Sequence, residues 1–233
     1  MNPNFTVVLC RPEIPENIGS VARCMMTFGL DDLRIVESKR LAPESRAYMT
    51  ARDAETILNS AKYFETLSDA VADCQQAFGF TRRGREKNQT VHELSEVEGN
   101  FEKSKTALVF GCESNGLAQD EILQATHLVR IASVDSELSL NLSHAVAIAL
   151  YALVPQYSKS VEQVSDRPTL GESHAALEQM LDALDRNGFL AKGNKEAVRR
   201  EKVALMWQRF HPTKQELDFL SGALRALVEK VGT

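Results

Sequence analysis

The sequence predicts an α/β fold in which a mostly parallel sheet is followed by a small all-helical domain. Short runs of β-branched and aliphatic residues alternate with segments of helical spacing, a pattern typical of a parallel sheet covered by helices. The C-terminal part shows helical spacing alone. With 233 residues, 43% of them hydrophobic, the chain can bury a sizeable core and is long enough for a second, smaller unit.

The expected strands lie at 5–10, 33–36, 76–80, 106–110 and 128–131, and the expected helices of the first domain lie at 18–28, 51–60 and 142–154. The run TALVF at 106–110 is continuously apolar, as in a strand buried on both faces, so we expect it at the centre of the sheet. The helix 142–154 is apolar on nearly every side. This predicts a position deep in the domain or in a dimer interface, with Pro155 ending the helix.

A polar stretch at 158–172, rich in Ser, Asp, Pro and Gly, predicts a linker. It divides the chain into a domain at 1–157 and a helical domain at 173–233. In the helical domain, Asn187-Gly188 is a stop signal and Asn194 is expected to cap the next helix. Thr213 followed by Glu216 predicts a capping box at the start of the last helix.

Charge and cysteine usage limit the classes of partner. The net charge of −5 means that any nucleic acid must be held by local basic patches. The four cysteines never occur as C-x-x-C, so neither a metal site nor a disulfide framework is indicated, and reduced thiols fit the cytoplasm. No segment has the uninterrupted apolar length of a membrane span. We therefore expect a cytoplasmic protein without a metal and without a membrane partner.

Three loops that follow expected strands carry the chemistry. The first, PENIGSVARCMMTFGL, places Asn17, Gly19 and Arg23 near the start of a helix. In open α/β sheets this carboxyl edge of the strands is where ligands bind. A capped amphipathic helix with a surface arginine explains the same segment equally well.

The second loop, LVFGCESNGL, brings Gly111 and Glu113 to the end of the central strand, where glycine lets the backbone contact a flat ligand such as adenine. The third, ELSLNLSHAV, places Ser139 and Asn141 just before the apolar helix. Taken singly, these residues also fit a tight turn and a helix cap. Their shared position after strands predicts that all three loops meet in one cleft.

In this order and at these separations, the three motifs resemble the signature motifs of the SpoU branch of the SPOUT RNA methyltransferases, over residues 5 to about 155. The tail, particularly NGFLAKGN and WQRFHPTKQELDFLSGALRAL, resembles that of the tRNA (cytidine/uridine-2′-O)-methyltransferases of this branch. The resemblance implies S-adenosylmethionine as cofactor, and transfer of its methyl group to the ribose 2′-hydroxyl of the first anticodon-loop nucleotide of tRNA, position 32. It also implies a homodimer whose sites are each completed by the partner chain, and a deep trefoil knot.

The resemblance also implies residue roles, carried over by position. The cofactor-binding residues are Phe80, Thr81, Arg82, Gly111, Ile131, Leu138, Ser139 and Leu140. The catalytic residues are Arg23, Asn17, Glu113, Ser139 and Asn141, and the RNA-binding residues are Arg23, Arg83 and Arg85. Arg23 matches the catalytic arginine of the family. Because a guanidinium is almost never deprotonated, binding a phosphate and polarising the ribose oxygen fit Arg23 better than proton abstraction.

The sequence departs from the family pattern at one position, and other functions are compatible with the same residues. Cys112 stands where relatives frequently carry arginine, which removes a positive charge near the RNA path, and the basic run around Arg83 and Arg85 also fits a solvated loop. A dinucleotide-dependent dehydrogenase would need a G-x-G-x-x-G loop, which the sequence lacks. An RNA-binding protein without catalysis, or methylation of another tRNA or rRNA nucleotide, is compatible with the same residues.

Overall fold

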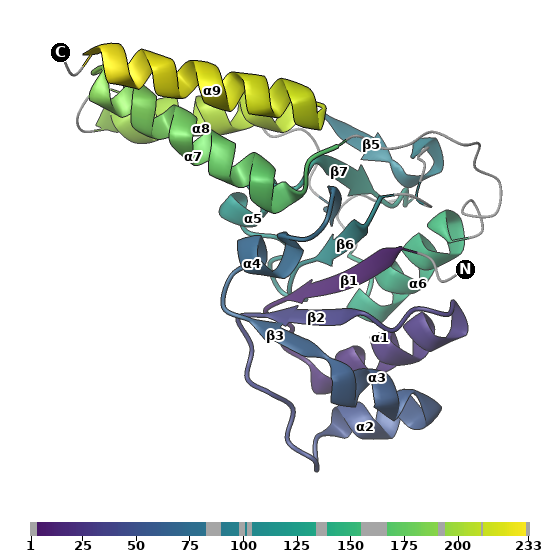
Figure 1. Cartoon of the computed structure of the whole chain (residues 1–233). Helices are drawn as coiled ribbons and strands as arrows, with labels where there is room; N and C mark the ends of the chain where they lie inside the picture. Colours follow the sequence, from purple (N-terminus) through teal and green to yellow (C-terminus); the bar gives the residue numbers. More distant parts are fainter. Residues whose placement is uncertain are drawn as a thin grey trace.

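The apolar runs of the sequence become the strands of one seven-stranded parallel sheet in the computed structural model, which describes residues 4–82, 90–97, 101, 104–133, 139–154, 167–190, 194–210 and 212–231 (Figure 1). The strands are β1 (Phe5–Cys10), β2 (Leu33–Val36), β3 (Lys62–Phe64), β4 (Gln76–Phe80), β5 (Val91–Glu93), β6 (Thr106–Phe110) and β7 (His127–Arg130). Their order is β3-β2-β1-β6-β4-β7-β5, and every pair is parallel. The run 106–110 is the central strand, as predicted.

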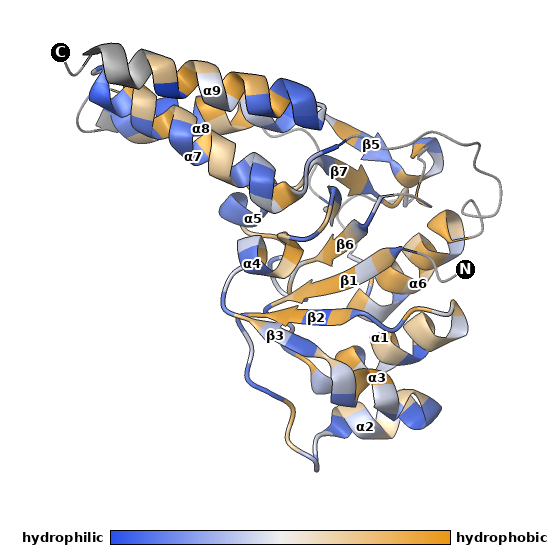
Figure 2. Ribbon diagram, in the orientation of Figure 1, coloured by the Kyte–Doolittle hydropathy of each residue, from blue (hydrophilic) through white to orange (hydrophobic). Residues whose placement is uncertain are grey.

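Helices cover both faces of this sheet. They are α1 (Pro15–Thr27), α2 (Arg46–Ala51), α3 (Glu55–Ser60), α4 (Leu67–Val71), α5 (Gln119–Gln124), α6 (Leu142–Leu153), α7 (Leu170–Arg186), α8 (Asn194–Arg209) and α9 (Lys214–Val231), with 3₁₀ turns at Arg52–Ala54 and Leu94–Glu96. Successive residues of a strand point to opposite faces. Val7 and Leu9 of β1 therefore join the core under α1, α2, α3 and α6, whereas Val8 and Cys10 join the core under α4 and α5. Figure 2 shows the hydrophobic strands between these two layers of helices.

The last three helices pack on one another around Ala176, Trp207 and Leu217. The predicted capping box of α9 is confirmed: the Glu216 backbone N–H donates to the Thr213 hydroxyl at 3.3 Å, and the Thr213 N–H donates to the Glu216 carboxylate at 2.8 Å. The predicted stop after α7 is confirmed by Gly188, which has a φ of +70°. Asn194 is the first residue of α8 rather than its cap.

Three local predictions differ from the structure. The helix expected at 51–60 is interrupted, because Arg52 has a φ of +51° and ends α2 before α3 begins. The strands β3 and β5, three residues each, were not predicted. α7 begins at Leu170, inside the stretch expected to be a linker, because Thr169 and Glu172 form a capping box there.

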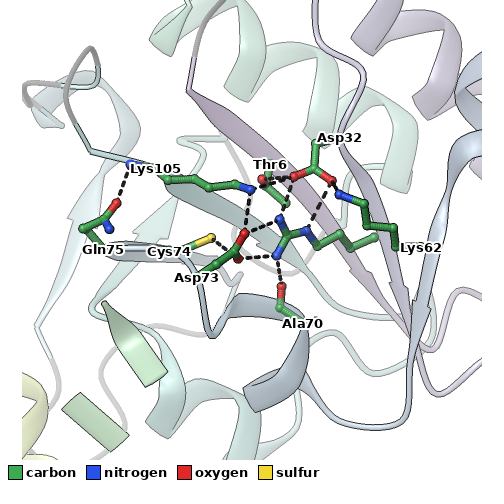
Figure 3. Close-up of polar contacts among 9 residues, drawn as sticks. Thr6, Asp32, Lys62, Ala70, Asp73, Cys74, Gln75 and Lys105 are labelled. Atoms are coloured by element: carbon green, nitrogen blue, oxygen red, sulfur yellow. Dashed lines mark hydrogen bonds and ion pairs between the residues drawn. The ribbon is translucent and has the colours of Figure 1, made fainter. Parts of the chain in front are cut away.

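An ion-pair network around a buried arginine joins the amino ends of the strands, on the edge opposite the loops that the three motifs occupy (Figure 3). Its centre is Arg34 of β2, whose side chain is only 3% exposed. The Arg34 guanidinium pairs with Asp73 at 2.6 Å and with Asp32 at 2.7 Å, and it also donates to the Ala70 carbonyl at 2.6 Å. Lys105 pairs with Asp73 at 2.7 Å. Asp32, Asp73 and Lys105 precede β2, β4 and β6, so the network fixes the starts of these three strands relative to one another.

We expect Arg34→Ala to lower the free energy of unfolding by about 3 kcal/mol, because it removes the buried guanidinium and leaves Asp32, whose side chain is 17% exposed, without its main partner. Urea unfolding at neutral pH measures this change. The matched control is Lys62→Ala, which removes an exposed partner of Asp32 at 3.0 Å and is expected to cost less than about 1 kcal/mol. Equal losses of unfolding free energy in the two variants would contradict a central role for Arg34.

The same network predicts how stability depends on pH. Hydrogen bonds from Arg34 hold the pKa of Asp73 well below its ordinary value. For Asp32, burial alone would raise the pKa, but hydrogen bonds from Arg34, Thr6 and Lys62 outweigh it and lower the pKa. A carboxylate with a lower pKa in the folded state stabilises the fold above its unfolded pKa and loses that contribution as pH falls toward the folded pKa. We therefore expect the network's contribution, measured as the difference between wild type and Arg34→Ala, to be constant above about pH 5 and to shrink below about pH 4.

Candidate active site

The loops at the carboxyl edge of the sheet enclose a cavity of about 340 Å³. Loops that follow β4, β6 and β7 form most of its wall, and the residues before and within α6 close it. The wall includes every described residue predicted to bind a cofactor, namely Phe80, Thr81, Arg82, Gly111, Ile131, Ser139 and Leu140. Leu138, the remaining one, lies outside the described residues. The carboxyl ends of parallel strands share one edge, which explains why residues so far apart in sequence meet here.

The chemistry of this wall suits a flat, partly polar molecule of moderate size. Phe80 stacks on Phe110 with ring centroids 4.4 Å apart, and further apolar surface comes from Leu117 and Val129. Small-molecule sites are typically cavities of roughly 300–1,000 Å³ that combine apolar walls with a few polar groups. One such polar group is Glu93 of β5. Its Oε1 accepts from Arg130 Nε at 2.9 Å, and its buried Oε2 has no hydrogen-bond partner among the residues that the structure describes. This carboxylate oxygen can accept a hydrogen bond from a ligand that carries N–H or O–H donors.

Two glycines shape the loop after β6. A Cβ at Gly111 would lie 2.0 Å from the carbonyl carbon of Gly116, so only glycine fits there. Gly116 itself has a φ of +68°, a conformation that favours glycine, and its N–H donates to the Cys112 carbonyl at 2.9 Å. Cys112 is buried against this turn, with its sulfur 3.7 Å from the Gly116 carbonyl oxygen. The tight turn places residues 111–117 along the cavity wall.

The three motifs are joined by a chain of hydrogen bonds beside the cavity. The Asn17 amide nitrogen donates to Glu113 Oε1 at 2.7 Å, and the Asn141 amide nitrogen donates to Asn17 Oδ1 at 2.9 Å. Asn141 also caps α6, since its Oδ1 accepts from the Ser143 N–H at 2.9 Å. Glu113 accepts in addition from the backbone N–H of Glu13 at 2.9 Å. The predicted meeting of the three loops is therefore found for these residues.

Arg23 is not part of this cavity wall. It lies on α1 six residues after Asn17, which places it about 120° away around the helix axis. The side chain is exposed, whereas Val21, Ala22 and Met25 are buried. Within one chain, Arg23 therefore does not join the residues predicted to bind the cofactor. The helical period explains this outcome, since Asn17 is on the buried side and Arg23 cannot share that side.

Arg83 and Arg85 lie outside the described residues. Among the residues that the structure does describe, no group of three or more His, Cys, Asp or Glu side chains is arranged to hold a metal ion. In the same part of the chain, every helix is too short or too polar to span a membrane.

Two contributors to the site, Glu93 and Glu13, could not be predicted from the sequence. Glu93 lies on β5, a three-residue strand at the edge of the sheet, and nothing in its neighbourhood has a pattern long enough to predict a strand. Glu13 contacts the loop after β6 through its backbone N–H, and its carboxylate accepts a hydrogen bond from Ser114. Backbone donors of this kind leave no signal in residue type, so sequence patterns cannot reveal them.

Comparison with known proteins agrees with this geometry. Residues 4–151 match the model of a family described as the SpoU rRNA Methylase family. A tRNA (cytidine-2′-O-)-methyltransferase TrmJ of Methanocaldococcus jannaschii is 36% identical over 67% of this chain and 69% of its own length. The tRNA (cytidine/uridine-2′-O-)-methyltransferase TrmJ of Citrobacter koseri is 31% identical over 99% of this chain and 98% of its own. The crystal structure of TrmJ from Z. mobilis ZM4 superposes with a TM-score of 0.80 at 29% identity, over 95% of this chain and 98% of that chain.

The family match covers the sheet and all three motif loops, and the similarity to TrmJ proteins extends through the three C-terminal helices. The resemblance inferred from Asn17, Glu113, Asn141 and their neighbours is thereby confirmed at the level of the family. The chain belongs to the SpoU rRNA Methylase family of methyltransferases.

Proposed function

We propose that this chain is a cytoplasmic, S-adenosylmethionine-dependent tRNA (cytidine/uridine-2′-O)-methyltransferase that acts on nucleotide 32, the first of the anticodon loop. The observation that carries this proposal is the cavity at the carboxyl edge of the sheet, whose wall includes all seven described residues expected to bind the cofactor. The similarity to TrmJ proteins along nearly the whole chain supports tRNA as the substrate. The choice of nucleotide 32 rests on the resemblance of the C-terminal helices.

The cavity wall fits S-adenosylmethionine. The backbone around Gly111 and Gly116 and the apolar side chains of Ile131 and Leu140 suit an adenine ring. Glu93 Oε2, which lacks a hydrogen-bond partner within the described part of the chain, suits a donor group of a cofactor with net positive charge. When bound, the cofactor supplies an electrophilic methyl group. The protein's part is then to hold the ribose 2′-oxygen in line with that group, because positioning accounts for much of the rate of such a transfer.

The catalytic roles follow from the hydrogen-bonded network. Glu113, Asn17 and Asn141 fix the relative positions of the three loops, and Ser139 lines the cavity where the ribose would enter. Arg23 is assigned to the phosphate next to the target ribose and to its 2′-oxygen. A permanently protonated guanidinium stabilises negative charge there, and the hydroxyl proton leaves to solvent as the carbon–oxygen bond forms.

Because Arg23 is exposed and is not part of the cavity wall of its own chain, we propose that it acts on the cavity of the partner subunit in a homodimer. α1 and α6 lie side by side and expose apolar side chains, with Met26 49% and Tyr151 73% exposed. Large exposed apolar side chains that cluster together mark protein interaction surfaces. Arg23 and Met26 are three residues apart and share one side of α1, so a partner docked there would receive Arg23.

We also propose three further features of this protein. The first is the deep trefoil knot in the C-terminal part of the sheet domain, supported by family membership. The second is the division of the chain into a methyltransferase domain and a helical C-terminal domain. The third is phosphate binding by Arg83 and Arg85, in a basic run next to the cavity residue Arg82. Each lost phosphate contact is expected to reduce the slope of log affinity against log salt by about one.

Incubation with radiolabelled S-adenosylmethionine and unmodified tRNA, followed by mass spectrometry of nuclease fragments, tests the proposed activity. We expect one 2′-O-methyl group, at nucleotide 32. The matched control is the same tRNA with 2′-deoxycytidine at position 32, which should remain unlabelled. Label at another tRNA nucleotide, or in rRNA alone, would overturn the substrate assignment. If no RNA carried label, the proposed methyl transfer would be overturned, and only the alternative of an RNA-binding protein without catalysis would stand.

A further inference from the structure

Arg11, the residue directly after β1, has an unusual backbone. Its φ is +49°, in the left-handed region that L side chains other than Asn and Asp rarely adopt. Such conformations persist where surrounding contacts hold them, and they gather near functional sites. Arg11 lies at the carboxyl edge of the sheet next to the cavity, but it is not part of the cavity wall. Its side chain therefore acts through other residues.

The side-chain hydrogen bonds of Arg11 lead to α5 and to the loop after β6, whereas its backbone N–H donates to the Val36 carbonyl of β2 at 2.9 Å. Its guanidinium forms a two-pronged ion pair with Glu121 of α5, through Nη1 to Oε1 and through Nη2 to Oε2 at 3.0 Å. Nη2 also donates to the Gly116 carbonyl at 3.4 Å. Glu121 is 2% exposed, and its Oε2 accepts from the Ala118 N–H at 2.6 Å. Together these contacts grip the segment Gly116–Ala118 from outside the cavity.

This segment determines the shape of the proposed cofactor loop. Gly116 packs so closely on Gly111 that no side chain fits between them, and both glycines line the cavity. The other end of the loop is held at Glu113 by the backbone N–H groups of Glu13 and Ile14. The chain after β1 therefore grips the loop after β6 at two points, with Arg11 at its base. A shift of Gly116 would move the backbone that faces the ligand.

We propose that Arg11 is a positioning residue for cofactor binding. Through Glu121 and the Gly116 carbonyl, it holds residues 111–117 in the conformation that accepts S-adenosylmethionine. This inference rests on the proposed function. It assigns no contact with substrate or cofactor to Arg11, and it explains why a strained arginine and a buried carboxylate lie behind the cavity. An unpaired buried carboxylate would be costly, so loss of Arg11 would force Glu121 and its loop to move.

Arg11→Gly tests the proposal. Because glycine adopts a positive φ without strain, the substitution removes the side-chain contacts with the loop and adds no backbone strain. We expect isothermal titration calorimetry to give a dissociation constant for S-adenosylhomocysteine about tenfold higher than for the wild type. The melting temperature should fall as well, because the buried Glu121 loses its partner. Arg11→Lys, which restores the positive charge opposite Glu121, should recover part of the affinity. The control Asp73→Asn weakens the ion-pair network at the opposite edge, and should lower the melting temperature without changing the affinity.

Glu121→Gln provides a second test if Arg11→Gly fails to fold. It keeps the size of the side chain and an acceptor for Ala118. It should weaken S-adenosylhomocysteine binding. The double variant Arg11→Lys with Glu121→Gln should lose no more affinity for S-adenosylhomocysteine than the weaker-binding of the two single variants. Additive losses, or wild-type affinity in Arg11→Gly, would overturn the positioning role alone. Failure of the wild-type protein to bind S-adenosylhomocysteine would instead overturn the proposed function.

Discussion

Replacing Arg23 by alanine is expected to lower kcat for tRNA methylation by about 10²–10⁴-fold while leaving the affinity for S-adenosylhomocysteine unchanged. The loss follows from the proposed task of Arg23, since removing a group that stabilises developing charge or assists proton transfer has effects of this size. The unchanged affinity follows from the structure, because Arg23 is not part of the cavity wall. Single-turnover kinetics and calorimetry measure the two quantities separately.

A matched control for this variant is Arg46→Ala. Arg46 is an exposed arginine of α2 that pairs with Glu16 of α1 at 3.2 Å, so its removal also deletes a positive charge beside α1. Its kcat should remain at the wild-type value. If Arg23→Ala turned over at the wild-type rate, Arg23 would have no part in the transfer, and the assignment of the first motif to catalysis would have to be abandoned.

Gly111→Ala is expected to weaken S-adenosylhomocysteine binding by about 10- to 100-fold. The added Cβ would lie 2.0 Å from the Gly116 carbonyl carbon and 2.2 Å from the Leu117 nitrogen, and both of these are backbone atoms. The loop after β6 must therefore move, and it forms part of the cavity wall. Gly222→Ala serves as the control, because its Cβ meets no atom within 4 Å and a helical alanine is favourable. Equal affinities for S-adenosylhomocysteine in the two variants would show that the loop after β6 does not contribute to ligand binding.

These two variants together distinguish action within one chain from action across a dimer. If Arg23 serves the cavity of the partner subunit, a mixed dimer of Arg23→Ala and Gly111→Ala contains one site with both Gly111 and Arg23 intact. Random mixing of equal amounts should then restore about a quarter of the wild-type activity, because half of the dimers are mixed and each has one active site. If both residues act within one chain, the mixture stays as inactive as its components.

The sequence predicted the inner strands well and the sheet edges poorly. β1, β2, β4 and β6 have the predicted bounds because each is a run of buried residues long enough to be distinctive. β3 and β5 are three residues long and partly exposed, and a pattern that short carries no period. The start of α7 was missed for a different reason. Thr169 and Glu172 have the spacing of a capping box, but the polar composition around them outweighed that signal.

The site was predictable as far as topology determines it. Parallel strands deliver the residues that follow them to one edge, so Gly111, Ile131 and the residues after β4 were expected to meet, and they do. The direction in which Arg23 faces depends on the phase of α1, which the position of its buried residues fixes only in the folded chain. The pair Arg11–Glu121 spans 110 residues of sequence, and no local pattern connects two such residues.

The buried network around Arg34 illustrates a second limit. An arginine within a four-residue strand of otherwise apolar side chains suggests an exposed edge, whereas Arg34 is buried. Its burial is possible because Asp32 and Asp73 compensate the charge, and Asp73 comes from the turn between α4 and β4. Compensation of this kind becomes visible only once the strands are assembled.

A crystal structure of the protein with S-adenosylhomocysteine tests the central claim most directly. We predict that the ligand occupies the cavity at the carboxyl edge of the sheet, with its adenine against the backbone of Gly111 and the side chains of Ile131 and Leu140, and that Arg23 of the partner subunit faces its sulfur atom. Ligand bound anywhere else on the chain, with this cavity filled by solvent, would contradict the account.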